Sequence, residues 1–379
     1  MRIAINGWFW DEPGTGSGQY LRHLVEAMLQ QAPHHDYLLA LPRPAAGPTP
    51  QGMRVVTQPA AAGHWGKLWF EQAAFPRLCR RLQAQAALVP YWASPLLPTC
   101  PTLVTVHDLI PLLLPAYRGG ALGALYLRLV SASARRARLV LTDSEASRRD
   151  IARRLGIPGQ RLRAIPLAAD QRFHRVSDPA LRESVRRRYG LPARFILYLG
   201  GFDQRKGVET LLQAFARWPI SVGQGPDAPC LALAGRLPTK KSPLFPDPLA
   251  LAAQLGLGQR VLFPGWVEDA DKAALYSLAD FFVFPSFYEG FGLPVLEAMA
   301  CGAAVIASSA ASVPEIVGEA GVLVPPGDAA TLAQAMAELW QDAQAREAWG
   351  RRAQQRAAQF SWAEAARRTL ACLDEAAAD

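Results

Sequence analysis

The sequence predicts an α/β protein built from two doubly wound parallel sheets, each with helices on both faces. The chain has 379 residues, half of them apolar, which is more than one ordinary hydrophobic core accommodates. Short β-branched runs alternate with longer helical stretches, and this alternation restarts near residue 194. Such alternation is typical of parallel strands joined by crossover helices. We therefore expect two domains of ordinary size.

The first half begins with a strand, a glycine loop and a helix. RIAING (2–7) is the strand, and GQYLRHLVEAMLQ (18–30) carries apolar residues at helical spacing. EASRRDIARRLG (145–156) is a later helix that ends at a glycine. Five further strands are expected between these helices: YLLALP (37–42), MRVVTQ (53–58), AALVPY (86–91), TLVTVHD (102–108) and ARLVLTDS (137–144).

The second half repeats the pattern after a polar, arginine-rich connection. Its expected strands are RFILYLGG (194–201), CLALAG (230–235), RVLFPGWV (260–267), DFFVFPS (280–286), AAVIASS (303–309) and GVLVPPGD (321–328). We place an N-terminal domain at 1–175, a C-terminal domain at 176–359, and a final helix at 360–379 that crosses back to the first domain. Ligands bind at the carboxyl ends of such sheets, so the space between the domains is the expected site.

Composition excludes several classes of protein. The five cysteines are widely spaced and form no CxxC, which indicates reduced thiols and a cytoplasmic location. The start of the chain shows no apolar signal core. The apolar stretch 84–117 is interrupted by prolines, a histidine and an aspartate, so it is not expected to span a membrane.

The net charge of +8 is concentrated in the front half. Residues 1–180 hold 21 basic and 11 acidic side chains, and the remainder holds 19 and 21. The most basic segments are 134–138 and 147–154. They either form solvated helix faces or attract an anionic partner such as a lipid diphosphate or an acidic membrane surface. No recognition-helix or aromatic-basic strand signature points to nucleic acid.

The segment FYEGFGLPVLEAM (287–299) places two glutamates across a turn and the first turn of a helix. Gly290 and Gly292 allow close approach of a ligand, and the helix start offers free N–H groups to an anion. Glu297 would repel that anion, so we expect it to accept hydrogen bonds from neutral hydroxyls such as a ribose diol. Glu289 is placed to contact a sugar attached to the phosphate. The structural alternative is a helix-start glutamate and a solvated loop glutamate.

The segment YLGGFDQRKGVETLLQAF (198–215) places two cations between a strand and a helix. Arg205 and Lys206 suit a diphosphate, because a guanidinium binds two oxygens and an ammonium adds a point charge. A basic helix start without a ligand is mildly unfavourable for the helix dipole.

Two other segments also follow strands. His107, in VTVHDLIPL (104–112), is either a satisfied core residue or a ligand contact, and Asp108 is expected to cap the next turn. The loop DEPGTGSGQYL (11–21) matches neither GxGxxG nor a P-loop. It is either a turn that starts a helix or a flexible loop whose amides close over phosphate or sugar.

Two weaker signals have alternative interpretations. The DAD at 269–271 resembles a metal-binding DxD, but its place before an amphipathic helix favours Asp269 as a helix cap. The segment 63–82 is aromatic and basic. It is either a membrane-surface helix or a helix packed on the first sheet, and the second interpretation is favoured.

These segments resemble the family-four retaining glycosyltransferases of GT-B architecture, in their mannosyltransferase-like branch. The E-x7-E segment EGFGLPVLE, followed by AMACGAAVIAS, is the most specific part of the resemblance, which covers nearly the whole chain. Further support comes from GGFDQRKG, GWVEDADKAALYSLAD, SVPEIVGEAGVLVPPGD and FSW in the second half, and from TGSGQYLRHL, VHDLIPLLLP and TDSEASRRDI in the first.

The resemblance implies a role for each matching residue. Glu289 matches the glutamate that touches the donor sugar, and Glu297 matches the one that holds the ribose. Arg205 and Lys206 match the pair on the diphosphate, and His107 matches the histidine near the reacting centre. The remaining donor-binding positions that match are Gly290, Phe291, Gly292, Leu293, Val267, Gly16 and Ser17.

Two positions depart from the family pattern. Where many relatives carry an arginine after the first glycine of the second-domain loop, this chain has Gly201, and Arg205 is expected to compensate. The GxGRY of relatives is GSGQY here, so Gln19 replaces an arginine on the donor or acceptor side.

The resemblance implies a metal-independent, retaining hexosyltransferase that uses a nucleotide diphosphate sugar and no other cofactor. GDP-mannose is the favoured donor and UDP-sugars come next. The acceptor is expected to be a glycan or a lipid-linked intermediate of surface polysaccharide synthesis. Separately, the basic N-terminal domain is expected to allow peripheral contact with an anionic membrane. The alternatives are a non-catalytic sugar-nucleotide-binding module and a phosphorylase or sugar-phosphate synthase of the same architecture.

Overall fold

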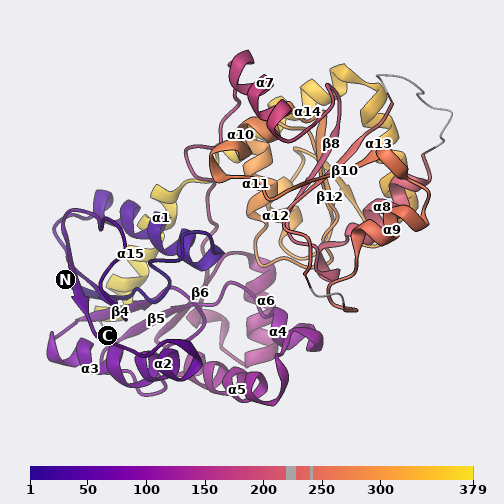
Figure 1. Ribbon diagram of the computed structural model, residues 1–379. Coiled ribbons are helices and arrows are strands. Elements are labelled where there is room, and N and C mark those ends of the chain that lie inside the picture. The colour runs from indigo at the N-terminus through magenta and orange to yellow at the C-terminus, as the bar shows by residue number, and fades with distance from the viewer. Residues whose placement is uncertain (219–227, 240–241, 379) are drawn as a thin grey trace. The chain divides into compact units, whose positions relative to one another are not determined.

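The computed structural model describes residues 1–218, 228–239 and 242–378 (Figure 1). The chain forms two compact units. Unit 1 comprises Met1–Leu167 and Ser361–Asp379, and unit 2 comprises Ala168–Phe360. Each unit contains one fully parallel sheet with helices on both faces, which confirms the predicted fold class.

Unit 1 contains a seven-stranded sheet in the order β3-β2-β1-β4-β5-β6-β7. Its strands are β1 (Arg2–Asn6), β2 (Asp36–Leu41), β3 (Met53–Thr57), β4 (Ala86–Val89), β5 (Thr102–Thr105), β6 (Leu139–Thr142) and β7 (Leu162–Ala164). Its helices are α1 (Gly16–Gln31), α2 (Gly63–Trp69), α3 (Phe75–Arg81), α4 (Ile110–Leu113), α5 (Gly120–Arg136), α6 (Glu145–Leu155) and α15 (Trp362–Ala378). The sequence patterns predict every one of these strands except β7, whose short segment is interrupted by Arg163 and shows no continuous apolar run.

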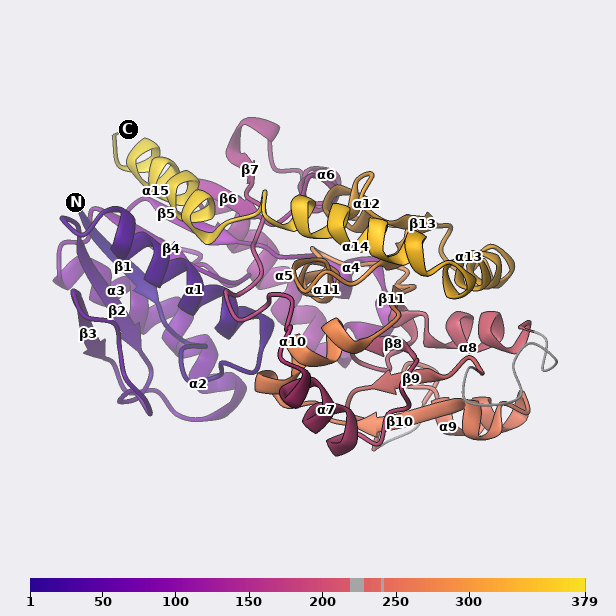
Figure 2. The ribbon, with the colours of Figure 1, turned by 90° about the horizontal axis from the view of Figure 1, so that it is seen from above.

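The two faces of the first sheet are covered by different helices. Ala4, Ala87 and Val104 pack into one buried cluster with side chains of α3, α5 and α6. On the other face α15 lies against α1 and contacts β4 and β5, as both ribbon views show (Figures 1 and 2). The segment 63–82 thus forms two helices joined by the π-helical turn Phe70–Ala74. The turn and α3 pack into the buried cluster, whereas α2 leaves Trp65 and Trp69 exposed.

Unit 2 contains a six-stranded sheet in the order β10-β9-β8-β11-β12-β13. Its strands are β8 (Ile196–Leu199), β9 (Leu231–Ala234), β10 (Val261–Gly265), β11 (Phe281–Phe284), β12 (Val305–Ser308) and β13 (Val322–Val324). Its helices are α7 (Pro179–Arg188), α8 (Val208–Ala216), α9 (Pro248–Gln254), α10 (Asp269–Leu278), α11 (Leu293–Ala300), α12 (Val313–Val317), α13 (Ala329–Gln341) and α14 (Ala343–Ala357). All six strands lie where the sequence patterns predict them.

The core of unit 2 follows from the alternation of side chains along each strand. Tyr198 and Val283 pack in one cluster with Leu211 of α8 and with side chains of α9 and α13. On the opposite face the ring of Tyr276, from α10, lies 5.3 Å from that of Phe282. The strand order reverses between β8 and β11, and ligands bind at this point of doubly wound sheets.

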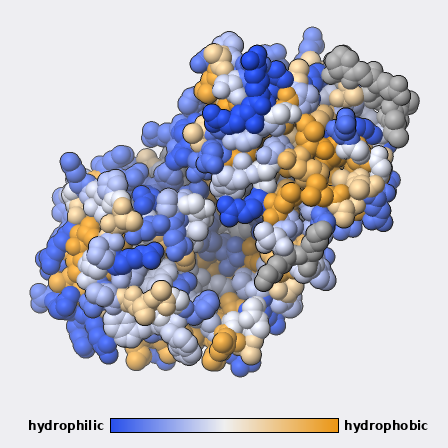
Figure 3. Space-filling model, in the orientation of Figure 1, coloured by the Kyte–Doolittle hydropathy of each residue, from blue (hydrophilic) through white to orange (hydrophobic). Residues whose placement is uncertain are grey.

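Figure 3 shows hydrophilic side chains over much of the visible face of both units, with apolar side chains gathered in patches among them. Within the described residues, no helix combines the length and the apolar character needed to cross a bilayer.

Candidate active site

Arg205, Lys206 and Glu289 meet at the point where the strand order of the second sheet reverses. The cations follow β8 and the glutamate follows β11. Arg205 Nη1 lies 2.8 Å from Glu289 Oε2, and Lys206 Nζ lies 2.8 Å from Glu289 Oε1. Each carboxylate oxygen therefore holds one cation. The sequence patterns predict these three residues at one site. The structure brings them into direct contact.

Local backbone geometry holds these two loops together. Gln204–Lys206 form a 3₁₀ turn, and Gly207 follows it with a φ of +68°. A Cβ atom on Gly207 would lie 2.2 Å from the carbonyl oxygen of Pro285, so only glycine fits there. The amide of Phe287 also donates to the carbonyl of Arg205 at 2.8 Å. The glycine thus lets the cation-bearing loop pack directly on the loop that carries Glu289.

The charges of this cluster are largely buried. Burial alone would raise the pKa of Glu289, but the nearby Lys206 and Arg205 outweigh it and hold that pKa below its ordinary value. The buried hydroxyl of Ser312 donates to the backbone carbonyls of Glu289 and Phe291, which anchors the turn before α11. Glu289 is thus an ionised, fixed carboxylate rather than a solvated loop side chain.

Glu297 lies one turn inside α11, as predicted. The helix begins at Leu293, after Gly292 with a φ of +119°. The hydroxyl of Tyr276 donates to Glu297 Oε2 at 3.0 Å. Burial raises the pKa of Glu297 to about 7, against the opposing influence of Lys272. Glu289 and Glu297 therefore differ in charge state near neutral pH, because cations are paired directly with only the first.

An aromatic and cationic group that the sequence patterns do not predict lies beside the predicted nucleotide position. Val267 is itself buried, but the neighbouring Trp266 is half exposed after β10. The guanidinium of Arg236 lies 5.2 Å from the indole centroid and Lys272 Nζ lies 5.8 Å from it. A tryptophan directly after a strand, with Lys272 and Tyr276 at helical spacing just beyond it, is the signal that could have identified this group.

The other predicted donor-binding residues of unit 2 lie on the same loops. Gly201 is exposed directly after β8, and Phe291 is buried in the turn before α11. The buried residues Gly290, Phe291 and Gly292 lead into Leu293, the partly buried first residue of α11. The structure thus places these positions beside the Arg205–Lys206–Glu289 cluster in the chain and at the same edge of the sheet.

In unit 1 the predicted histidine, which is partly buried, pairs with a buried aspartate. His107 Nδ1 lies 2.7 Å from Asp143 Oδ2, and its Nε2 lies 3.3 Å from the carbonyl of Pro90. The ring of Tyr20 packs edge-on at 4.8 Å. Burial alone would lower the pKa of His107, but Asp143 outweighs it and raises that pKa. Asp108 accepts from the amide of Ile110 at the start of α4, as the sequence predicts.

The glycine-rich segment 11–18 contains the turn that starts α1. Gly16 and Ser17 form the first turn of the helix, and the Thr15 side chain caps that turn by accepting from the amide of Gly18. A Cβ on Gly18 would lie 2.1 Å from the carbonyl oxygen of Glu12, so the loop folds closely onto the helix start. The turn that starts a helix is therefore confirmed, and contact of its amides with phosphate or sugar stays a prediction.

The DAD segment is occupied by ion pairs. Asp269 is the first residue of α10 rather than its cap, and its carboxylate lies 2.5 Å from Lys272 Nζ. Asp271 accepts from Arg188 and from Tyr189. Across the described residues, no group of three or more His, Cys, Asp or Glu side chains is placed to hold a metal ion.

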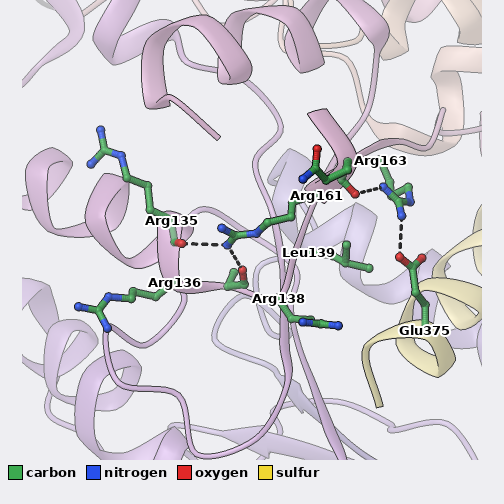
Figure 4. Close-up of a pocket in the computed structure, with 9 residues that line it drawn as sticks. Arg135, Arg136, Arg138, Leu139, Arg161, Arg163 and Glu375 are labelled. Carbon is green, nitrogen blue, oxygen red and sulfur yellow. Dashed lines mark hydrogen bonds and ion pairs between the residues drawn. The ribbon is translucent and has the colours of Figure 1, made fainter. Parts of the chain in front are cut away.

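The basic segment 134–138 lines a pocket of about 700 Å³ in unit 1 (Figure 4). This pocket lies at the amino ends of β6 and β7, the edge of the sheet opposite to His107. Arg161 donates to the carbonyls of Arg135 and Ala137, and Arg163 pairs with Glu375 of α15 at 2.7 Å. These contacts tie the end of α5 and the last helix to the sheet edge.

The fold of the whole chain is that of known GT-B enzymes. Sucrose-phosphate synthase from Thermosynechococcus elongatus superposes with a TM-score of 0.76, 25% identity and full coverage of both chains. HepE of Anabaena, in complex with UDP and glucose, superposes with a TM-score of 0.74, 22% identity and 99% coverage of both chains. The chain therefore has the GT-B fold.

Two family models together span most of the sequence. Residues 14–173 match the model described as Glycosyltransferase Family 4, and residues 182–356 match the model described as Glycosyl transferases group 1. The chain belongs to this glycosyltransferase family, which confirms the resemblance found in the sequence.

Several curated relatives are bacterial mannosyltransferases. O-antigen chain mannosyltransferase B of Escherichia coli is 35% identical over 236 residues, which cover 62% of this chain and 60% of the relative. The serotype-specific mannosyltransferase WbdA of Escherichia coli is 32% identical over 268 residues, which cover 70% of this chain and 32% of the relative. The aligned part of the chain thus spans about 60% of the length of the first and about a third of the second.

Proposed function

We propose that this protein is a retaining glycosyltransferase that moves a sugar from a nucleotide diphosphate sugar to a glycan or lipid-linked acceptor in surface polysaccharide synthesis. GDP-mannose is the favoured donor, which the similarity to mannosyltransferases supports. The observation that carries the proposal is the contact of Arg205 and Lys206 with Glu289, beside the start of α11. This is a cationic site with a helix start, which suits a diphosphate flanked by a sugar.

The proposed chemistry follows from where charge develops. Breaking the bond at the anomeric carbon leaves negative charge on the diphosphate. Fixed cations and helix amides stabilise that charge without reorganising, so Arg205, Lys206 and the start of α11 favour departure of the nucleotide. These groups supply the neutralisation that a metal ion supplies elsewhere, so we propose that transfer is independent of metal.

Glu289 acts in this proposal as a residue that positions the donor. Its carboxylate is committed to two cations, so a role as a covalent nucleophile is disfavoured. It fixes both cations and presents an acceptor to the sugar hydroxyls. The leaving phosphate oxygen takes the proton of the incoming acceptor hydroxyl, on the face that the nucleotide leaves, which accounts for retention. Glu297 accepts hydrogen bonds from the ribose, and Trp266 offers a ring face to the base.

Product analysis tests the proposal directly. The protein is incubated with GDP-mannose and mannose oligosaccharides, and products are measured by mass spectrometry with and without a chelator. Glu289→Ala is expected to abolish transfer while GDP binding, measured by calorimetry, survives. Glu209→Ala is the matched control, because Glu209 is an exposed glutamate on α8. Full transfer by Glu289→Ala would contradict the proposal.

The same experiment separates the alternatives. Nucleotide binding without any product in the wild type would favour a non-catalytic module, and product formation that requires phosphate would favour a phosphorylase. Thermal-shift measurements with GDP, UDP and ADP sugars would rank the donors. A ligand at a hundred times its dissociation constant adds about 2.7 kcal/mol of stability. A larger shift with UDP-glucose than with GDP-mannose would transfer the proposal to a UDP-sugar.

We also propose that unit 1 makes peripheral contact with anionic membranes through the arginine-lined pocket. Its five arginines face a single acidic residue, Glu375, so the local charge favours an acidic surface. Flotation with phosphatidylglycerol vesicles should capture the wild type, and Arg135→Gln with Arg136→Gln should reduce capture. Arg351→Gln with Arg352→Gln on α14 is the control pair. Equal capture by neutral phosphatidylcholine vesicles would contradict this proposal.

A further inference from the structure

The strand order of the first sheet also reverses, between β1 and β4. Asn6 ends β1, and Tyr91 lies two residues beyond the end of β4. Asn6 Oδ1 accepts from the Tyr91 hydroxyl at 3.2 Å and from the amide of Trp8 at 3.1 Å. The two strand ends are thus tied together by side chains. In a doubly wound sheet this point is where a ligand binds, and His107 lies at the same edge, after β5.

An ammonium group surrounded by aromatic rings lies at this point. Lys67 Nζ, from α2, is 4.8 Å from the ring centroid of Phe9, 5.1 Å from that of Tyr91 and 5.7 Å from that of Tyr126. Phe9 and Tyr91 pack edge to face at 4.9 Å. The Lys67 side chain remains 24% exposed, and Phe9 is also partly exposed. Solvent therefore reaches the lysine and one of the rings around it.

A fully buried carboxylate holds this lysine in place. Glu71 lies in the π-helical turn between α2 and α3, and its Oε1 is 3.8 Å from Lys67 Nζ. The Tyr126 hydroxyl, from α5, lies 3.1 Å from both carboxylate oxygens. Isolated π-helical turns are frequent at functional sites. A buried carboxylate is costly unless it is paired, so its presence here calls for a role.

We propose that Lys67 and Phe9 form the accessible part of the subsite that binds the acceptor sugar, with the buried Tyr91 packed behind them, and that Glu71 is the residue that positions Lys67. An ammonium offers up to three donors to sugar hydroxyl oxygens, and aromatic rings offer apolar faces to the C–H bonds of a pyranose. The paired Glu71 offsets the charge of Lys67, so the subsite suits a neutral sugar rather than a phosphate. This inference rests on the proposed glycosyltransferase function and names its acceptor-binding residues.

The charged and titratable groups around this subsite come from several segments of unit 1. Lys67, Tyr126 and Tyr91 face Glu71, and Glu12 of the loop before α1 also faces Lys67. Burial raises the pKa of Glu71 to about 7, against the opposing influence of Lys67 and the tyrosines. Burial also lowers the pKa of Lys67, against Glu71 and Glu12. Protonation of Glu71 below pH 7 removes the charge that orients the ammonium.

The first test separates acceptor binding from donor binding. Mannose oligosaccharides serve as the acceptor probe, GDP-mannose is saturating, and hydrolysis of GDP-mannose is followed without acceptor. Lys67→Met should raise the acceptor KM by about tenfold or more, because a hydrogen bond from a charged group is lost. Donor hydrolysis and GDP affinity should be unchanged. Lys67→Arg should restore part of the acceptor affinity.

Controls make the outcomes distinct. Arg77→Met, an exposed cation on α3, should leave the acceptor KM unchanged. Near-ultraviolet circular dichroism identifies any variant that fails to fold. An unchanged acceptor KM in folded Lys67→Met would overturn the subsite while leaving the proposed function intact. A wild type that neither binds GDP nor hydrolyses GDP-mannose would remove the proposed function, and the subsite with it.

The second test addresses the positioning role of Glu71. The acceptor KM of the wild type should rise as the pH falls from 8 to 6, because Glu71 is protonated in this range. Glu71→Gln should have a raised acceptor KM that no longer changes between pH 8 and pH 6. Because the wild-type KM rises over the same range, the ratio of mutant to wild-type KM should be several-fold lower at pH 6 than at pH 8. A residue with a purely structural role would give a constant ratio, and that result would overturn the assignment of Glu71.

Discussion

Lys206 Nζ and Glu289 Oε1 lie 2.8 Å apart, although 83 residues separate them in the chain. With Arg205 on the other carboxylate oxygen, the structure holds two cations at a single buried carboxylate. Arg205 Nε also lies 3.5 Å from Asp203 Oδ1, so the two cations face two carboxylates. The proposed donor site therefore holds its cations in place by ion pairs before a diphosphate binds.

The contact of Lys206 with Glu289 predicts the effect of removing this lysine. Lys206→Met should weaken GDP binding by about tenfold or more, because a charge-assisted contact is lost while Arg205 remains paired with Glu289. Calorimetry at low and moderate salt is the measurement, and the salt dependence of the affinity should fall in the variant. Arg217→Met removes an exposed cation at the end of α8 and should change neither quantity. Equal affinities for Lys206→Met and wild type would contradict the assignment.

Glu297 predicts a dependence of donor affinity on pH. Its pKa of about 7 means that the carboxylate is protonated below neutrality and ionised above it. The groups that face it are Lys272, Tyr276, Asp269 and Arg172. If a ribose diol binds the ionised form, affinity for GDP-mannose should rise by about tenfold between pH 6 and pH 8. GDP-mannose rather than GDP is the probe in this measurement. Its diphosphate is esterified at both ends and therefore does not itself titrate between pH 6 and pH 8.

The corresponding variant separates Glu297 from other sources of pH dependence. Glu297→Gln should bind GDP-mannose with an affinity that is nearly constant between pH 6 and pH 8. A wild-type profile that persists unchanged in Glu297→Gln would assign the titration to another group.

The pairing of His107 with the buried Asp143 predicts that the stability of the fold depends on pH. The pKa of His107 is raised in the folded state, so the pair stabilises fully below the unfolded pKa of about 6.5 and loses this stabilisation as the pH rises through the folded value. Asp143→Asn should therefore lower the melting temperature more at pH 6 than at pH 9, by roughly 2–4 °C for each kcal/mol of pairing. Scanning calorimetry at both pH values is the measurement.

Glu26→Gln is the control for that comparison. It replaces an exposed carboxylate of α1 by an amide and should have no pH-dependent effect on melting. Equal lowering by Asp143→Asn at pH 6 and pH 9 would show that the charge of His107 does not contribute.

Gly207 and Gly256 allow a matched test of the loop geometry. Their φ angles are +68° and +67°, so both positions strain a side chain equally. A Cβ on Gly207 would lie 2.2 Å from the Pro285 carbonyl, whereas nothing lies within 4 Å of a Cβ on Gly256. Gly256→Ala should cost about 1–2 kcal/mol of unfolding free energy, and Gly207→Ala should cost at least twice as much. Urea unfolding measures both, and similar costs would contradict the close approach of the two loops.

Much of the fold could be predicted from local pattern alone. Among the described residues, twelve of the thirteen strands have β-branched or apolar runs bounded by turn residues, and such runs indicate burial on both faces of a parallel sheet. β7 lacks such a run because Arg163 interrupts it. The segment 11–18 allows two interpretations because glycines and prolines occur both in open loops and in capped turns, and only the close approach of Gly18 to the Glu12 carbonyl identifies the capped turn.

The candidate site was predictable where residue type and position coincide with a strand end. Glu289, Glu297, Arg205, Lys206 and His107 each follow a recognisable strand or turn. Trp266 was missed because a lone tryptophan after a strand is ordinarily a packing residue. Glu71 was passed over because nothing in a helical pattern marks a π-helical turn or a fully buried carboxylate.

The sequence by itself determined the fold class, the family and the strand ends that carry the candidate site residues, because periodicity and short motifs are local properties of the chain. Only the tertiary structure decided which side chains meet: Glu289 with two cations, Glu297 with Tyr276, and Lys67 with Glu71 and three rings. Pairing and burial depend on contacts between distant segments. Those contacts also set the charge of each carboxylate, which makes Glu289 an ionised anchor and leaves Glu297 and Glu71 poised near neutrality.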